Sequence, residues 1–331
     1  MHLSRKGKSM EMHYLLHHVF TNSWQRVPDK HAVIDNQRQL SYSQLNKLAG
    51  VLAQKLKESG IERGDRVAFF LDHDCNQAIS ILAISSLGAV FIPVNRLLHP
   101  DQVRHIVFDS GSKVLITTRE RLSQVTEVME TCDELKEILL ADELDGENYL
   151  ERTTPAIEND LAAILYTSGS SGRPKGVMLS HKNLLSGCWI VSEYLKLHGE
   201  DRLLGVLPLS FDYGLNQLLT MLALGGTYVF SSFKYPNDIV SDLVRHKITG
   251  LAGIPPIWAL LVRSSLEDTD LPDLRYISNS GGAVATSILD RLRKALPETD
   301  VFLMYGLTEA FRSTYLPPHQ LDARPTSMGK A

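Results

Sequence analysis

Strand-like and helix-like segments alternate along almost the whole chain of 331 residues. The helical pattern is clearest at 41–59, where leucines recur on one face, Ser41 and Gln44 form a capping box, and Gly60 ends the run. Compact apolar runs between such segments predict buried strands, as at 66–71. Since parallel strands need long crossovers that are usually helical, this alternation predicts an α/β fold with largely parallel sheets flanked by helices.

The same patterns place the other elements. Further helices are predicted at 76–87, 99–110, 182–197, 214–224, 236–246, 256–264 and 286–296. Further strands are predicted at 89–94, 113–117, 161–166, 202–207, 227–230, 250–254, 275–280 and 301–305. No internal repeat is visible.

Composition excludes several classes of function. The net charge of −4 provides no global basic field, so we expect no nucleic-acid partner. Cys75, Cys132 and Cys188 lie far apart and form neither a disulfide framework nor a zinc pattern, which favours the cytoplasm. The longest apolar run, 78–94, contains three serines and Pro93, so it predicts a buried helix and strand and no membrane span.

Residues 167–176 read TSGSSGRPKG, a pattern that suits a phosphate-binding loop. Gly169, Gly172 and Gly176 permit unusual backbone angles and close approach to a ligand. Backbone N–H groups of such a loop can form an anion-binding nest, and Arg173 and Lys175 add positive charge. The hydroxyl donors are Thr167, Ser168, Ser170 and Ser171.

Two other interpretations of this run are less favoured. A flexible Ser/Gly linker rarely lies between a strand-like run, here 161–166, and a helix start, which is how VMLSHKNLL after the loop reads. A Walker A motif requires Gly-Lys followed by Ser or Thr after four spacer residues. Here Gly172 is followed by Arg173, Pro174 and Lys175, which disfavours a P-loop ATPase or kinase.

The loop resembles the TSGSTGxPKG loop of the AMP-forming, or adenylate-forming, ligases. This superfamily includes acyl-CoA synthetases, peptide-synthetase adenylation domains and firefly luciferase. Three further segments resemble its signatures in the expected order over about half the chain: PLSFDYGL at 208–215, NSGGA at 279–283 and YGLTE at 305–309.

The resemblance implies two stacked α/β subdomains, without most of the β-barrel subdomain and without the C-terminal domain. One subdomain would comprise 12–60 and 185–315, and the other 61–184. Residues 1–11 would be a flexible tail, and 316–331 would begin the β-barrel. We therefore expect a large N-terminal domain that is weakly active or inactive alone.

The resemblance also implies acid activation. A carboxylate attacks the α-phosphorus of ATP, giving an acyl-adenylate and pyrophosphate, and a thiol of CoA or a phosphopantetheine carrier protein then takes the acyl group. The predicted catalytic residues are Thr167, Lys175, Thr308 and Glu309, with Glu309 binding Mg²⁺. The predicted nucleotide-binding residues are Thr167, Ser168, Gly169, Ser170, Ser171, Gly172, Lys175, Gly281, Gly282, Ala283, Tyr305, Gly306 and Thr308.

Within that set, Thr167 to Lys175 would wrap the β- and γ-phosphates, and Thr308 would contact the α-phosphate. Tyr305 would stack on adenine, with the turn at Gly281 along its other side. An alternative for Glu309 is a charge at a helix N-terminus. An alternative for the whole chain is a non-catalytic nucleotide-binding or regulatory module.

The substrate residues predicted by resemblance are Phe211, Asp212 and Ser280. Adenylation domains for α-amino acids carry Phe-Asp at 211–212, where the Asp binds the substrate ammonium, and a buried carboxylate needs such a cationic partner. The alternative is a structural Asp that caps a helix starting near Gly214. Amino acids and plain acyl acids both stay open as substrates. Trp258 is a further pocket candidate, with a core position as its alternative.

Overall fold

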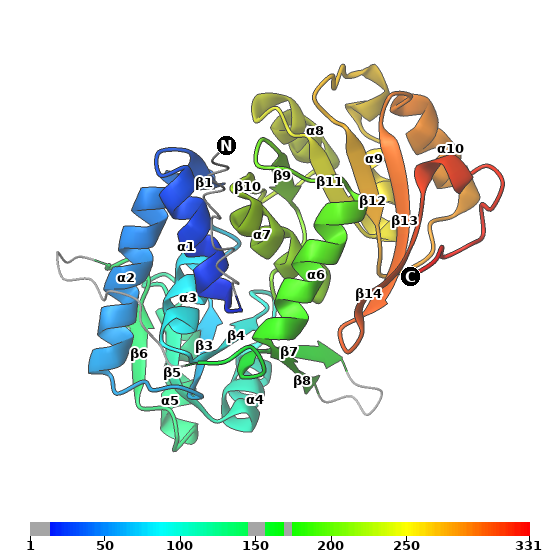
Figure 1. Ribbon diagram of the computed structural model, residues 1–331. Coiled ribbons are helices and arrows are strands. Elements are labelled where there is room, and N and C mark those ends of the chain that lie inside the picture. Colours follow the sequence, from blue (N-terminus) through cyan, green and yellow to red (C-terminus); the bar gives the residue numbers. More distant parts are fainter. Residues whose placement is uncertain (1–13, 145–155, 169–173) are drawn as a thin grey trace, which may run out of the picture.

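The computed structural model describes residues 14–144, 156–168 and 174–331, and it contains two sheets with helices between and outside them (Figure 1). This confirms the predicted α/β class with two largely parallel sheets flanked by helices. The predicted tail at 1–11 lies outside the described residues. The predicted subdomain boundaries stay a prediction.

The larger sheet has eight strands, and its neighbours are parallel except at the two edge pairs. Those pairs are β1 with β2 at one edge and β13 with β14 at the other. The spatial order is β14 (Phe311–Leu316), β13 (Asp300–Leu307), β12 (Tyr276–Asn279), β11 (Gly250–Gly253), β9 (Arg202–Gly205), β10 (Thr227–Phe230), β1 (His31–Ile34) and β2 (Gln39–Ser41).

The smaller sheet has six strands and only one antiparallel pair, β7 with β8, at its edge. Its order is β6 (Glu137–Leu140), β5 (Ser112–Thr117), β3 (Arg66–Phe70), β4 (Val90–Val94), β7 (Leu161–Ser168) and β8 (Pro174–Ser180).

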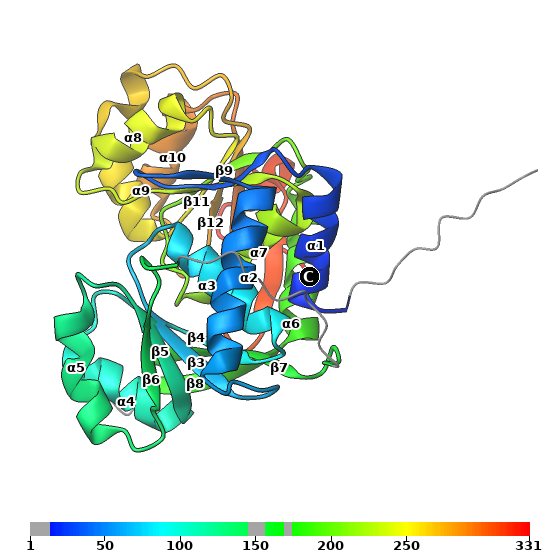
Figure 2. The same cartoon turned by 90° about the vertical axis from the view of Figure 1, so that its left-hand side faces the viewer.

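Helices form three layers around the two sheets (Figure 2). Five lie between the sheets and join their cores: α1 (Leu16–Arg26), α2 (Tyr42–Glu58), α3 (Cys75–Ser86), α6 (His181–Tyr194) and α7 (Asp212–Leu224). The outer face of the six-stranded sheet is covered by α4 (Pro100–Ser110) and α5 (Leu122–Thr131). The outer face of the eight-stranded sheet is covered by α8 (Pro236–Arg245), α9 (Pro255–Leu261) and α10 (Thr286–Ala295).

Local sequence rules account for several boundaries. The predicted capping box of α2 is present, because the Ser41 side chain accepts from the Gln44 amide and the Gln44 side chain accepts from the Ser41 amide. Gly60 follows the helix with a φ of 77°, which favours glycine. Pro100 and Pro236 stand at the first position of α4 and α8, where a missing N–H costs nothing.

One sequence-based expectation is wrong. The segment after the phosphate-loop motif reads as a helix start, but 174–180 is the strand β8, and α6 begins only at His181. The motif therefore joins two antiparallel strands. Within the described part of the chain, no helix combines the length and apolar character that a membrane crossing requires.

Candidate functional site

Four of the parallel strands in the eight-stranded sheet end at one edge, and the segments that follow them carry the motifs. In an open α/β sheet, ligands bind outside the carboxyl ends of the strands. The segments are 206–212 after β9, 254–255 after β11, 280–282 after β12 and 308–309 after β13. Since β9, β11, β12 and β13 are consecutive neighbours, these segments lie side by side.

Asp212 and Thr308 bring two of the motifs into contact. Thr308 Oγ1 lies 3.5 Å from Asp212 Oδ1 as a donor at the limit of hydrogen-bond distance, and the two residues are 7% and 3% exposed. Asp212 is the first residue of α7, and Phe211 occupies the N-cap without a side-chain capping bond. The prediction that Asp212 caps a helix near Gly214 is therefore wrong, although its charge still favours the first turn.

Gly214 lets α7 start against the end of β9. A β-carbon at this position would lie 2.4 Å from the carbonyl oxygen of Pro208 and 2.8 Å from that of Leu207. No other residue type fits so close an approach without a backbone shift. This glycine thus fixes how near Asp212 lies to the carboxyl edge of the sheet.

Two consecutive side-chain hydrogen bonds connect the turn after β12 to helix α9. Trp258 Nε1 donates to Asn279 Oδ1 at 2.9 Å, and Asn279 Nδ2 donates to the Gly282 carbonyl at 2.8 Å. Gly281 has a φ of 77°, which glycine adopts without strain. Trp258 is buried in the hydrophobic core and reaches the turn only through Asn279.

Tyr305 and the glycine turn lie on adjacent strands at the same level. Asn279 is the cross-strand partner of Leu303, so the residues that follow it pass beside Tyr305. The Tyr305 ring is 39% exposed, and Gly281 and Gly282 are exposed, while Ser280 is buried. Ala283 is exposed and Gly306 is half-buried. An exposed ring beside a bare backbone turn can hold a flat heterocycle.

Glu309 lies in the tight turn 308–310 between β13 and β14. No helix begins there, so its alternative interpretation as a helix N-terminal charge is wrong. Glu309 borders a cavity of about 220 Å³ that is also lined by Asn183, Ser186, Gly187 and Ile190 of α6. The described residues contain no cluster of three or more His, Cys, Asp or Glu side chains that could hold a metal alone. A single carboxylate still fits Mg²⁺, which is usually held by one or two carboxylates with phosphate oxygens and water.

The phosphate-loop motif belongs to the β7–β8 hairpin at the edge of the smaller sheet. Thr167 and Lys175 are cross-strand partners, so their side chains share one face. Lys175 is exposed, and Thr167 is half-buried. Gly169, Ser170, Ser171 and Gly172 lie outside the described residues, as does the side chain of Ser168.

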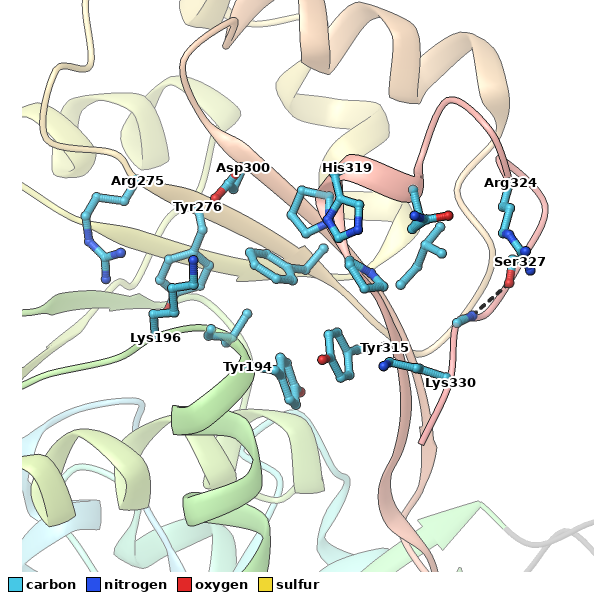
Figure 3. Close-up of a pocket in the computed structure, with 17 residues that line it drawn as sticks. Tyr194, Lys196, Arg275, Tyr276, Asp300, Tyr315, His319, Arg324, Ser327 and Lys330 are labelled. Carbon is cyan, nitrogen blue, oxygen red and sulfur yellow. Dashed lines mark hydrogen bonds between the residues drawn. The ribbon is translucent and has the colours of Figure 1, made fainter.

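A cavity of about 740 Å³ lies at the opposite end of the larger sheet (Figure 3). It is lined at the starts of β12 and β13 by Arg275, Tyr276 and Asp300, and by the stacked rings of Tyr194 and Tyr315. No predicted site residue lines it. Its size exceeds that of the cavity beside Glu309, but its position at the amino ends of the strands separates it from the motifs.

His73 contributes to this edge without having been predicted from the sequence. It follows β3, and its Nε2 donates to the carbonyl of Gly205 at the end of β9, 2.9 Å away. Burial lowers its pKa to about 4, so the ring is neutral. This hydrogen bond joins the carboxyl ends of the two sheets. The only signal in the sequence is its place just after a predicted strand, which could have marked it as a residue of that edge.

Comparisons with known proteins agree with this geometry. A family model described as AMP-binding enzyme matches residues 20–331. Bacitracin synthase 3 of Bacillus licheniformis is 28% identical over 89% of this chain and 4% of its own length. Feruloyl-CoA synthase of an Amycolatopsis species is 31% identical over 82% of this chain and 55% of its own length. The chain therefore spans about half, or much less, of these relatives.

A solved structure, that of VinN in complex with L-aspartate, is 26% identical and has a TM-score of 0.84. The match covers 95% of this chain and 81% of VinN. The similarity thus extends over nearly the whole of this chain.

Proposed function

The chain belongs to the AMP-binding enzyme family, and on this premise we propose that it activates a carboxylic acid with ATP. The products would be an acyl-adenylate and pyrophosphate, and the acyl group would pass to a thiol of CoA or of a phosphopantetheine carrier protein. The observation that carries the proposal is the contact between Thr308 and Asp212 at the carboxyl edge of the larger sheet. It places a phosphate-binding candidate beside an acid-binding candidate.

The nucleotide would lie along this edge. Adenine would lie between the Tyr305 ring and the turn at Gly281, and Thr308 would donate to the α-phosphate. Lys175 and Thr167 would approach the outer phosphates from one face of the β7–β8 hairpin. The carboxylate oxygen would form a bond to the α-phosphorus as the bond to pyrophosphate breaks. Because the protein supplies neither the attacking nor the leaving group, these residues would act by positioning and by stabilising charge.

Mg²⁺ would neutralise phosphate charge when bound at Glu309. Glu309 contributes a carboxylate that projects from a short turn next to Thr308. This placement suits a metal that keeps several of its ligands from substrate and water.

The acid would be a small one that carries an α-ammonium group. Asp212 supports this, because a carboxylate that is 3% exposed beside the reacting centre is stabilised by a cation. Phe211 and Ser280 would form the walls next to it. The named relatives include both bacitracin synthase 3 and a feruloyl-CoA synthase, so a plain acid is the competing outcome.

The thiol acceptor fits the same relatives, because one is named a CoA synthase. We also propose a cytoplasmic location. All three cysteines are buried and lie outside any disulfide, as in proteins of a reducing compartment.

Isotope exchange between pyrophosphate and ATP tests the proposal. We expect slow exchange that depends on the acid when a panel of amino acids and plain acids is supplied, and exchange at least about a hundredfold slower in Lys175→Ala. ATP binding without acid-dependent exchange from any member of the panel would overturn the proposal and favour a nucleotide-binding module.

A further inference from the structure

Helix α4 contacts the β7–β8 hairpin at two points near the end that carries the phosphate-loop motif. His105 Nε2 lies 3.2 Å from the carbonyl oxygen of Pro174, the first residue of β8. Because a carbonyl only accepts, His105 must be the donor and must carry its proton on Nε2. One turn further along α4, Asp109 Oδ2 accepts from the Tyr166 hydroxyl at 2.6 Å. Each strand of the hairpin is thus attached to the same helix.

The hairpin has two faces with different partners. Ile164 and Tyr166 of β7 pack in the cluster that contains the apolar residues of α4. Ala163 and Leu165 belong to the other core, on the side of the larger sheet. Since side chains alternate along a strand, Thr167 lies on this second face, and its cross-strand partner Lys175 lies there too. The helix therefore holds the hairpin from behind, and the two predicted phosphate ligands are on the front.

Gly176 makes the rear contact possible. It is the cross-strand partner of Tyr166, and a β-carbon there would lie 2.6 Å from Ile164 Cγ2 and 3.2 Å from Tyr166 Cζ. A side chain at this position would force the Ile164 methyl group to move and would crowd the Tyr166 ring, whose hydroxyl donates to Asp109. The last glycine of TSGSSGRPKG thus serves the packing behind the loop.

We propose that His105 and Asp109 are positioning residues, which fix the β7–β8 hairpin so that Thr167 and Lys175 face the outer phosphates of ATP. The inference rests on the proposed function, because it assumes that ATP binds at this edge. Burial and the hydrogen bond to Asp109 raise the pKa of the Tyr166 hydroxyl, so it stays a donor across the physiological range.

The experiment measures ATP affinity by calorimetry in single variants of α4. We expect His105→Ala and Asp109→Ala each to weaken ATP binding about fivefold, the effect of one hydrogen bond. His105→Gln and Asp109→Asn should restore the affinity, because the amides keep a donor and an acceptor at nearly the same positions. Arg104→Ala is the matched control, since this residue lies on the same helix and its exposed side chain pairs with Asp101.

A second readout is independent of catalysis. Amide hydrogen exchange of 175–180 in the nucleotide-free chain should be faster in both alanine variants and unchanged in Arg104→Ala. Unchanged ATP affinity in both alanine variants would overturn the inference, as would an affinity loss that the Gln and Asn variants share.

The two proposals fail in different ways. If the parent chain binds ATP but shows no acid-dependent exchange, the proposed function fails, and the effect of His105 and Asp109 is still judged by ATP affinity. A parent chain that does not bind ATP overturns both.

Discussion

Two hairpins on the same side of the molecule, β7–β8 and β13–β14, carry the two clearest motifs, and they are held in different ways (Figure 1). Each adds an antiparallel edge strand to a mostly parallel sheet. The β7–β8 hairpin is held from behind by two hydrogen bonds from α4. The β13–β14 hairpin is packed against α6 by an aromatic stack, in which the rings of Tyr315 of β14 and Tyr194 of α6 have centroids 4.3 Å apart and planes at 9°.

The difference shows how one site can be assembled from two kinds of support. The hydrogen bonds between α4 and the loop end of β7–β8 depend on single atoms, so their loss should shift Lys175 slightly without unfolding the chain. The tyrosine stack depends on buried area, so its loss should lower the free energy of unfolding first. The tips differ as well, since Thr308 is buried against Asp212 while Lys175 is exposed.

The largest expected effect concerns the tip of the first hairpin. Lys175→Ala should lower acid-dependent exchange by about a hundredfold to a thousandfold, because it removes a charge that stabilises developing negative charge on phosphate. The initial rate of isotope exchange is the measurement. Lys182→Ala is the control, an exposed lysine just beyond β8 that pairs with Glu158. Equal losses in the two variants would mean that only bulk charge matters.

The next effect concerns the link between the two sheets that bear the hairpins. The pKa of His73 is lowered from 6.5 to about 4 by burial, so the unfolded chain binds a proton below pH 6.5 while the folded chain does not until about pH 4. This contribution to stability is full above pH 6.5 and is lost as the pH falls to about 4. The loss amounts to about 3 kcal/mol.

Urea unfolding of the parent and of His73→Gln across this pH range isolates the effect. His181 has the same lowered pKa of about 4 and adds a loss of the same sign. Asp74, whose pKa burial raises to about 6, acts in the opposite direction below pH 6. Both are common to the two proteins, so their difference reports His73. Parallel curves would show that folding does not lower the pKa of His73.

A smaller effect should come from the stack behind the second hairpin. Tyr315→Ala should lower the free energy of unfolding by about 2 kcal/mol, because it removes a half-buried ring together with its stacking contact to Tyr194. Tyr315→Phe keeps the stack and should match the parent within about 0.5 kcal/mol. Urea titrations decide between them, and an alanine variant as stable as the parent would remove the distinction drawn between the hairpins.

The smallest effect concerns the tip of the second hairpin. Thr308→Val keeps the shape of the side chain but removes the hydroxyl that faces Asp212, so acid-dependent exchange should slow about tenfold. Thr308→Ser keeps the hydroxyl and should retain most of the rate. If valine and serine behave alike, the hydroxyl has no part in the reaction.

Much of the fold could be predicted because local signals agree with the tertiary structure. The capping box at Ser41 and the strand at 66–71 are examples in which the sequence pattern and the final environment match. The strands β8 and β14 could not be predicted, because they become strands by pairing with β7 and β13. The prediction of a helix start at VMLSHKNLL used local sequence alone, so it could not account for pairing with β7.

The candidate site shows the same limit. The sequence supplied the motifs, and the strand order then explains why residues 96 positions apart, Asp212 and Thr308, meet. The support from Trp258 through Asn279 and from α4 to β8 depends on distances that no spacing rule gives. Such supporting residues have no sequence signature, because a His or Asp that holds a hairpin cannot be distinguished in the sequence from any other His or Asp on a helix surface.

The most direct test of the account compares two non-hydrolysable acyl-sulfamoyl-adenosines by calorimetry, one with an α-ammonium group and one with a plain acyl chain of similar size. Both share the adenosine contacts, so the difference isolates Asp212. We predict that both bind and that the amino form binds at least about tenfold more tightly. We also predict that Asp212→Asn abolishes this preference. Tighter binding of the plain form, or a preference that persists in Asp212→Asn, would contradict the account.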